Sequence, residues 1–325
     1  MLLRHRPMRP KDIAECVDIV KTHPVIGPRY GRAIDDLRAA WLQLLGREAM
    51  ITAVMEAVED LRARICFVAV SVCVTDDFIR ELKTAPLFWV GPELAKRTVQ
   101  GDCPVLTDRQ LREQNSRGGV SNVTWEAFPR AGYEAHGELY RKIMECYIET
   151  HQGFLWKELI AGQVESPQRL QWNLRNGGLL WDAERGRYVD ALDRDPEEIV
   201  REPHIVGLTR DIEISRPASW VGALFRYHPP RFGFSRSEQE LLLSALDGAT
   251  DEELSKSLHV SLATVKKQWL SIYRRVAAGL PELISSESTE GPESKRGKEK
   301  RRHLLAYLHE HPEELRPTIA KSLLS

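Results

Sequence analysis

Apolar and polar positions alternate with helical and strand-like periods along the first half of the chain. The segment LLRHRPMRPKDIAECVDIV, residues 2–20, predicts a short strand followed by a helix with Asp12 as its N-cap. Residues 33–57 carry a second helical pattern ahead of MITAVMEAV. The next run, ICFVAVSVCV at 65–74, is β-branched and apolar on both faces, which is typical of a central strand in a sheet covered on both sides.

Two more elements complete the pattern of this half. Residues 118–128, GGVSNVTWEAF, predict a strand entered through a glycine turn, and residues 136–154 predict a helix that packs on the sheet. Strands and helices therefore interleave, and residues 1–165 predict an α/β or α+β domain.

Residues 166–230 are less regular and predict a β-rich connector or extension. RNGGLLWDAERGRYVD in this part reads as a β-hairpin with its turn at 183–186. Because Pro229 and Pro230 cannot continue a helix, they mark a domain boundary. Residues 231–325 are then expected to form an all-α domain.

This helical part begins with three capped helices. Ser235 begins the first helix, which runs to residue 246 and ends at Gly248, a position suited to left-handed backbone. Thr250 begins a short second helix with Glu253 completing a capping box, and Ser261 begins the third helix. Two helices joined by a short turn form the unit that places its second helix in a DNA major groove.

The third helix is amphipathic. Its apolar stripe predicts a buried face, made of Val265, Trp269, Ile272 and Val276. Other residues lie off that stripe, as a surface facing phosphates requires; they are Lys266, Lys267, Leu270 and Arg274. A polar insertion at 285–302, acidic and then basic, predicts a mobile loop. The final helix, expected at 302–310, is a candidate dimer contact.

Composition narrows the classes of function. The 325 residues are 42% hydrophobic and 29% charged with a net charge of −1, so a polyanion site must come from local charge. No secretory signal is evident, and the longest apolar run is about half of a membrane span. The five cysteines form no CxxC pair and lie at no zinc-ligand spacing, which predicts a reduced, cytoplasmic protein without a metal site.

Residues 234–276 resemble the LuxR/FixJ-type helix-turn-helix domain of bacterial transcription regulators, whose pattern they follow without a gap. Departures are Ser237, Ser255 and Gln268, where the family has arginine, alanine and histidine. The matching positions are Glu238, Glu240, Leu242, Gly248, Thr250, Glu253, Leu254, Leu258, Val260, Ser261, Thr264, Val265, Lys266, Ile272 and Arg275.

This resemblance implies roles for individual side chains. Thr264 and Lys266 would hold the phosphate backbone and groove edge, while Lys267 and Leu270 would face the base edges. Lysine donates to guanine O6 and N7, whereas Leu270 can only pack, for instance on a thymine methyl group. Helix N-termini and basic side chains add phosphate contacts. The candidate DNA-binding residues are Thr250, Lys256, Ser261, Thr264, Lys266, Lys267, Leu270 and Arg274.

The beginning of the chain resembles GNAT-type N-acetyltransferases, in the segments MRPKDIAECVDIV and ARICFVAVSVCVTDDF. The resemblance implies a mixed sheet that holds acetyl-CoA. The family's pyrophosphate loop is not found, since RAGYEAHGEL at 130–139 has the wrong spacing and NSRGGV at 115–120 leads into a strand. No catalytic motif is evident, and Glu145, Tyr147 and His151 are more easily read as packing residues than as general acids or bases. No cofactor is therefore assigned, and a non-catalytic domain is favoured over an enzyme.

These patterns together predict a DNA-binding transcription regulator. Its expected partners are double-stranded DNA, a second copy of the chain on DNA, a small-molecule effector and RNA polymerase, and no membrane. Two alternatives stay open: an active N-acetyltransferase with a DNA-targeting module, and a sigma-factor-like or protein-interaction helical module.

Overall fold

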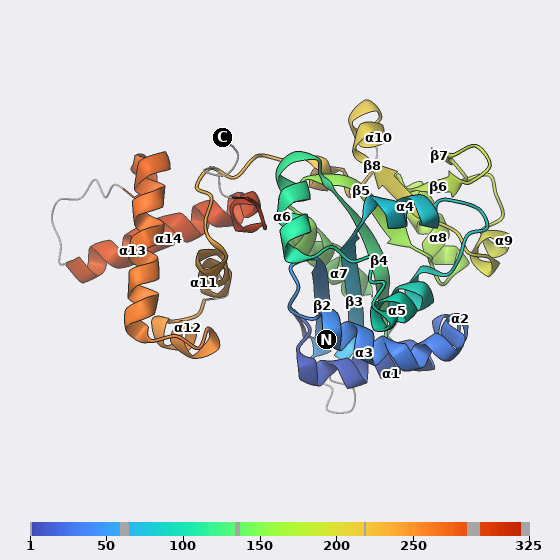
Figure 1. Ribbon diagram of the computed structural model, residues 1–325, viewed down its shortest axis with the longest axis horizontal. Coiled ribbons are helices and arrows are strands. Elements are labelled where there is room, and N and C mark those ends of the chain that lie inside the picture. Colours follow the sequence, from blue (N-terminus) through green and yellow to red (C-terminus); the bar gives the residue numbers. More distant parts are fainter. Residues whose placement is uncertain are drawn as a thin grey trace. The chain divides into compact units, whose positions relative to one another are not determined.

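The computed structural model describes residues 2–58, 65–133, 137–217, 219–246, 248–284 and 293–319. Contacts divide the chain into two compact units (Figure 1). The first comprises Met1–His151 and Leu155–Phe225, and the second comprises Gln152–Phe154 and Arg226–Ser325. The change of unit at residue 226 falls close to the boundary expected at Pro229 and Pro230.

The first unit is mixed α/β and contains an eight-stranded sheet. Neighbouring strands are antiparallel throughout, except that β4 and β5 are parallel. In spatial order the strands are β1 (Leu3–Arg6), β2 (Met50–Ala57), β3 (Ile65–Val74), β4 (Val120–Pro129), β5 (Trp156–Gly162), β8 (Val206–Thr209), β6 (Leu179–Asp182) and β7 (Arg187–Val189).

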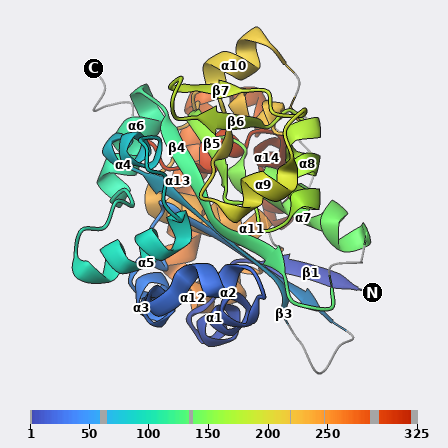
Figure 2. The same ribbon diagram turned by 90° about the vertical axis from the view of Figure 1, so that its right-hand side faces the viewer.

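Helices cover both faces of this sheet (Figure 2). α1, α3 and α5 lie against one face, and α7 packs on the opposite face, where it also connects the parallel strands β4 and β5. The helices of the unit are α1 (Ile13–Thr22), α2 (Ile26–Tyr30), α3 (Ile34–Leu44), α4 (Asp76–Leu82), α5 (Val90–Gln100), α6 (Asp108–Arg117), α7 (Gly137–His151), α8 (Pro167–Arg175), α9 (Pro196–Arg201) and α10 (Arg210–Ser215).

Several expectations for this unit are confirmed and others are wrong. Residues 65–74 form the buried interior strand β3, and the predicted hairpin forms as β6 and β7. The helical pattern of 33–57 is wrong in its second half, because α3 ends at Leu44 and MITAVMEA pairs with β1 and β3 as strand β2. Of the connector or extension expected at 166–230, the extension is confirmed for residues 166–225, which add β6, β7 and β8 to the sheet.

Asp12 precedes α1 as expected, but its side chain makes no capping bond to that helix. Its carboxylate instead accepts hydrogen bonds from the Arg6 guanidinium at 2.5 and 3.0 Å. Arg6 also pairs with Glu56 of β2 at 2.7 Å, and all three side chains are buried. A buried charge needs a partner, so this cluster ties β1 to β2 and to the start of α1.

The second unit is helical and contains α11 (Arg236–Leu246), α12 (Asp251–Ser257), α13 (Leu262–Gly279) and α14 (Glu293–Glu310). The predicted caps are confirmed: Thr250 and Glu253 form a capping box, and Ser261 accepts from the N–H of Thr264. Gly248 has a φ of 85°, which is the left-handed conformation expected after α11. The turn between α12 and α13 is tight enough to place His259 at a φ of 53°.

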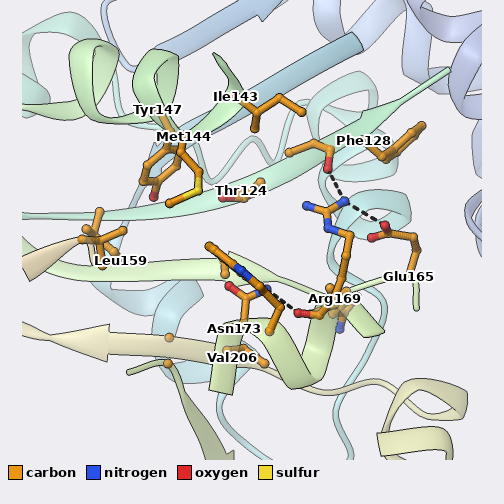
Figure 3. Close-up of a pocket in the computed structure, with 18 of the residues that line it drawn as sticks. Thr124, Phe128, Ile143, Met144, Tyr147, Leu159, Glu165, Arg169, Asn173 and Val206 are labelled. Atoms are coloured by element: carbon orange, nitrogen blue, oxygen red, sulfur yellow. Dashed lines mark hydrogen bonds and ion pairs between the residues drawn. The ribbon is translucent and has the colours of Figure 1, made fainter. Parts of the chain in front are cut away.

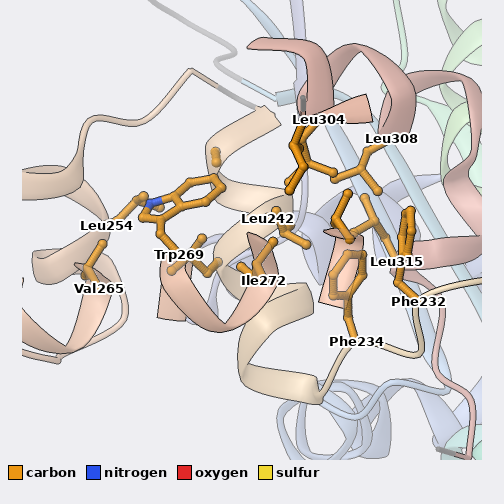
Figure 4. Packing of buried hydrophobic residues seen from close by; sticks show 14 residues of the cluster. Phe232, Phe234, Leu242, Leu254, Val265, Trp269, Ile272, Leu304, Leu308 and Leu315 are labelled. Atoms are coloured by element: carbon orange, nitrogen blue, oxygen red, sulfur yellow. The ribbon is translucent and has the colours of Figure 1, made fainter. Parts of the chain in front are cut away.

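A single apolar core holds these helices together (Figure 4). Leu304 and Leu308 of α14 contribute to it, and α14 begins at Glu293 rather than at residue 302. The expected mobile loop at 285–302 is therefore wrong for its second half, and residues 285–292 lie outside the described part of the chain. The core residues of α11–α13 include Leu241, Leu242, Ala245, Leu254, Val265, Trp269, Ile272 and Val276.

Candidate DNA-binding surface and ligand cavity

α13 has one buried face and one exposed face, as its stripe predicts. All four stripe residues are at most 6% exposed. On the other face Lys266, Lys267 and Arg274 are exposed together with Leu270, which leaves 51% of its surface open to solvent. Because single exposed leucines are common on protein surfaces, it is the cations around Leu270 that indicate a partner at this face.

The charged residues of α13 itself are all positive, although α12 begins with Asp251, Glu252 and Glu253. Between Glu253 and Glu282 the sequence has five Lys or Arg residues and no Asp or Glu. Lys256, at the end of α12, is also exposed. Although the whole chain is close to neutral, α13 therefore presents a local positive field of the kind that phosphates need.

The remaining candidates are hydroxyl residues at helix starts. Thr250 and Ser261 are exposed N-caps, and the Ser261 hydroxyl lies 2.9 Å from that of Thr264, which is half-buried. These hydroxyls stabilise α12 and α13 in the structure, and their contacts with phosphate stay predictions. The structure brings the eight candidate residues onto α12, α13 and the starts of these two helices.

Two carboxylates, the buried Glu238 and the half-buried Asp251, hold α13 in place. Glu238 of α11 pairs with Arg275 at 3.2 Å and accepts the Ser271 hydroxyl at 2.8 Å. Burial alone raises the pKa of Glu238, but the hydrogen bonds from Ser235 and Ser271 and the charge of Arg275 outweigh it and lower the pKa overall. Arg275 and the arginine that precedes it are both exposed, but Arg275 is paired with Glu238 and so helps to hold the helix.

On its other side α13 is held through Asp251, which accepts from the Trp269 indole N–H at 3.3 Å. Arg301 of α14 pairs with Asp251 at 2.8 Å and lies 4.4 Å from the Trp269 ring. The basic half of the polar insertion thus supplies a structural arginine. Only the mixed charge of that segment was visible in the sequence.

A cavity of about 390 Å³ lies in the first unit, where the parallel strands β4 and β5 separate (Figure 3). Their pairing ends at Val123 and Ile160, whereas β4 continues to Pro129. β4 also carries a β-bulge at Trp125, because Val70 pairs with Glu126 and Ser71 with Thr124. The parting of the strands leaves room between β4, β5, α7 and α8.

The walls of the cavity are largely aromatic and aliphatic. Tyr147 of α7, Trp172 of α8 and Trp220 form a continuous aromatic wall, with ring centroids 5.5 Å apart between Tyr147 and Trp220 and 5.7 Å apart between Trp172 and Trp220. Met144 and Leu159 add aliphatic surface on the side of Tyr147 (Figure 3). Small-molecule sites typically combine such walls with a few polar groups.

Three charged residues line the cavity. Glu126 of β4 accepts the Tyr30 hydroxyl at 2.6 Å and is only 6% exposed. Burial raises the pKa of Glu126 to about 8, although the Tyr30 hydroxyl and the Arg29 charge oppose the shift. Arg169 pairs with Glu165 at 2.8 Å and donates to the Ala127 carbonyl at 2.7 Å (Figure 3).

Three residues of this region, Glu145, Tyr147 and His151, were predicted to be packing residues. Tyr147 lines the cavity, and His151 is buried with its Nε2 atom 2.8 Å from the Ser71 hydroxyl. Glu145 is exposed and pairs with Arg141 at 2.5 Å, on the outer side of α7. Glu126 was missed, although a carboxylate inside the apolar strand VTWEAF was a readable signal.

The cysteines and the other potential metal ligands form no further site in the described part of the chain. Cys66 and Cys73 are buried as expected, and burial raises the pKa of the Cys73 thiol to about 12. Within the described residues no cluster of His, Cys, Asp or Glu is arranged to hold a metal ion. No helix in that part of the chain has the length and apolar character that crossing a membrane requires.

Comparison with protein-family models, with curated proteins and with solved structures gave no match.

Proposed function

We propose that the chain is a DNA-binding transcription regulator of the LuxR type. The observation that carries the proposal is the exposed face of α13, where Lys266, Lys267 and Arg274 surround an exposed leucine while the opposite face packs into the core. In this proposal α13 enters the major groove, its lysines donate to phosphates and guanine edges, and Leu270 packs on a thymine methyl group.

The proposal also covers how the protein would bind DNA tightly and how an effector would regulate it. One helix of this size gives modest affinity, so two copies would read two half-sites, with α14 as the candidate dimer contact. The GNAT-like first unit would act as a sensor whose effector occupies the cavity between β4 and β5. RNA polymerase would be a further partner of the regulator on DNA.

The test is selection of genomic fragments with the full chain, followed by affinity for the enriched site at several salt concentrations. A defined site, with log K falling linearly in log salt at a slope of several phosphates, supports the proposal. Weak binding without enrichment of any site counts against it. A module that binds only proteins, or that needs polymerase to reach DNA, gives this second result.

Leu270→Ala isolates the contribution of base contact. We expect affinity for the best site to fall about fivefold, because an apolar contact of roughly 1 kcal/mol is lost, while the salt slope stays the same. Leu243→Ala is the matched control, since Leu243 is 42% exposed on α11. Equal affinities for both variants would show that Leu270 does not touch the bases.

A second candidate function is an N-acyltransferase with an appended DNA-targeting module. It is favoured by the gap between the parallel strands β4 and β5, with the buried Glu126 at its edge as a general acid or base whose pKa of about 8 lies near the working pH. Saturable binding of coenzyme A, followed by acetyl transfer to any of a panel of amines, would support this candidate. Regulation without either result would favour the sensor.

A further inference from the structure

The charges around the cavity of the first unit are already matched within the protein. Among the lining residues that the structure describes, Arg169 is the sole Lys, Arg or His, and its guanidinium is paired with Glu165. The third charged residue, Glu126, is bonded by the Tyr30 hydroxyl and holds its proton at neutral pH, because burial raises its pKa to about 8. A bound ion would therefore meet no unmatched opposite charge.

The shape of the cavity also favours an uncharged ligand. Tyr147, Trp172 and Trp220 come from three separate segments and present one continuous aromatic wall. Trp172 is 39% exposed, and Tyr147 and Trp220 beside it are half-buried, so this side of the cavity is open to an entering molecule. An exposed tryptophan next to a cavity of about 390 Å³ is a surface that an apolar ligand would cover.

We propose that this cavity binds an uncharged, largely apolar molecule with an aromatic or similarly flat body, packed against Tyr147, Trp172 and Trp220. The inference rests on the proposed role of the first unit as a sensor and specifies the chemical class of its effector. An ionised group would lose its hydration in the cavity without gaining a partner, which weakens its binding. The flat apolar body is stabilised by burial and by ring contacts.

Two fluorescent probes that share one skeleton test the charge requirement. N-phenyl-1-naphthylamine is uncharged, and 8-anilino-1-naphthalenesulfonate adds one sulfonate. With the full chain we expect saturable binding of the uncharged probe at one site and binding of the sulfonate at least about tenfold weaker. Equal affinities, or no saturable binding of the uncharged probe, would overturn the proposal.

Variants locate the site. Ala161→Trp fills the cavity from an exposed position on β5, and we expect it to weaken binding of the uncharged probe at least about tenfold. Ala14→Trp, at an exposed position of α1 outside the cavity, is the matched control and should bind as the wild type does. Trp172→Ala removes part of the wall and should also weaken binding. Binding that neither cavity variant changes would place the probe elsewhere and refute the inference.

The outcomes for the two units are separable. A chain that selects DNA fragments but does not bind the uncharged probe in the cavity refutes this inference alone. A chain that binds the probe with the expected sensitivity to Ala161→Trp, but enriches no DNA site, refutes the regulator and leaves the ligand class standing.

Discussion

Replacing both Lys266 and Lys267 with glutamate is expected to lower affinity for a selected DNA site by at least about 100-fold. Both lysines are exposed on the face of α13 away from the core, so the change should leave the free energy of unfolding nearly as it is. Each lost phosphate contact removes about 0.9 from the magnitude of the salt slope, and each new carboxylate is repelled by the DNA. Because Lys266 is assigned to phosphate and Lys267 to base edges, the slope should fall by at least about 0.9 for each bound chain.

The control is a double reversal with the same change in net charge at a distance from α13. Lys21 of α1 and Lys96 of α5 are exposed on the first unit, and replacing both with glutamate should change affinity only slightly. Affinity is measured by fluorescence anisotropy over a range of salt concentrations. If the variant of Lys266 and Lys267 still binds DNA with an unchanged slope, α13 is not the groove helix.

The features of α13 could be predicted because they are local in sequence. A stripe at spacings of three and four residues, and a hydroxyl residue at the start of a helical pattern, are decided within one or two turns. Thr250 and Ser261 consequently cap the helices that the sequence predicts. The fit between Arg301, Asp251 and Trp269 could not be predicted, since it joins residues far apart in the chain.

The sheet shows the limit of local patterns more clearly. MITAVMEA contains good helix formers, but pairing with β1 and β3 makes it a strand, because context outweighs propensity. The cavity depends on where β4 and β5 part, which is a property of two strands separated by α7. Neither Glu126 nor the aromatic wall could be assigned to a site until the strand order was known.

Glu126→Gln is expected to change how the stability of the first unit depends on pH. The pKa of Glu126 is raised from 4.5 to about 8 in the folded chain. Below pH 4.5 both the folded and the unfolded chain hold the proton, so the free energy of unfolding does not depend on this group. Between pH 4.5 and 8 the unfolded chain has lost the proton that the folded chain keeps. The wild type is therefore progressively destabilised as pH rises through this window.

The expected size of this loss is about 3 to 5 kcal/mol, since each pKa unit corresponds to about 1.4 kcal/mol. Glutamine has nearly the same shape and its carbonyl can still accept the Tyr30 hydroxyl, but it carries no charge at any pH. Glu126→Gln should therefore match the wild type near pH 4.5 and exceed it in stability at pH 8.5. Other titrating groups cancel when the two proteins are compared at each pH.

Denaturant unfolding of the first unit, followed by tryptophan fluorescence at several pH values, measures the difference. Glu113→Gln is the control, because Glu113 lies on the solvent side of α6 with 48% of its side chain exposed and should leave the profile of the wild type unchanged. A constant difference between Glu126→Gln and wild type from pH 4.5 to 8.5 would mean that Glu126 is already ionised in the folded chain. The cavity would then carry a negative charge at neutral pH, and a cationic ligand would become the better fit.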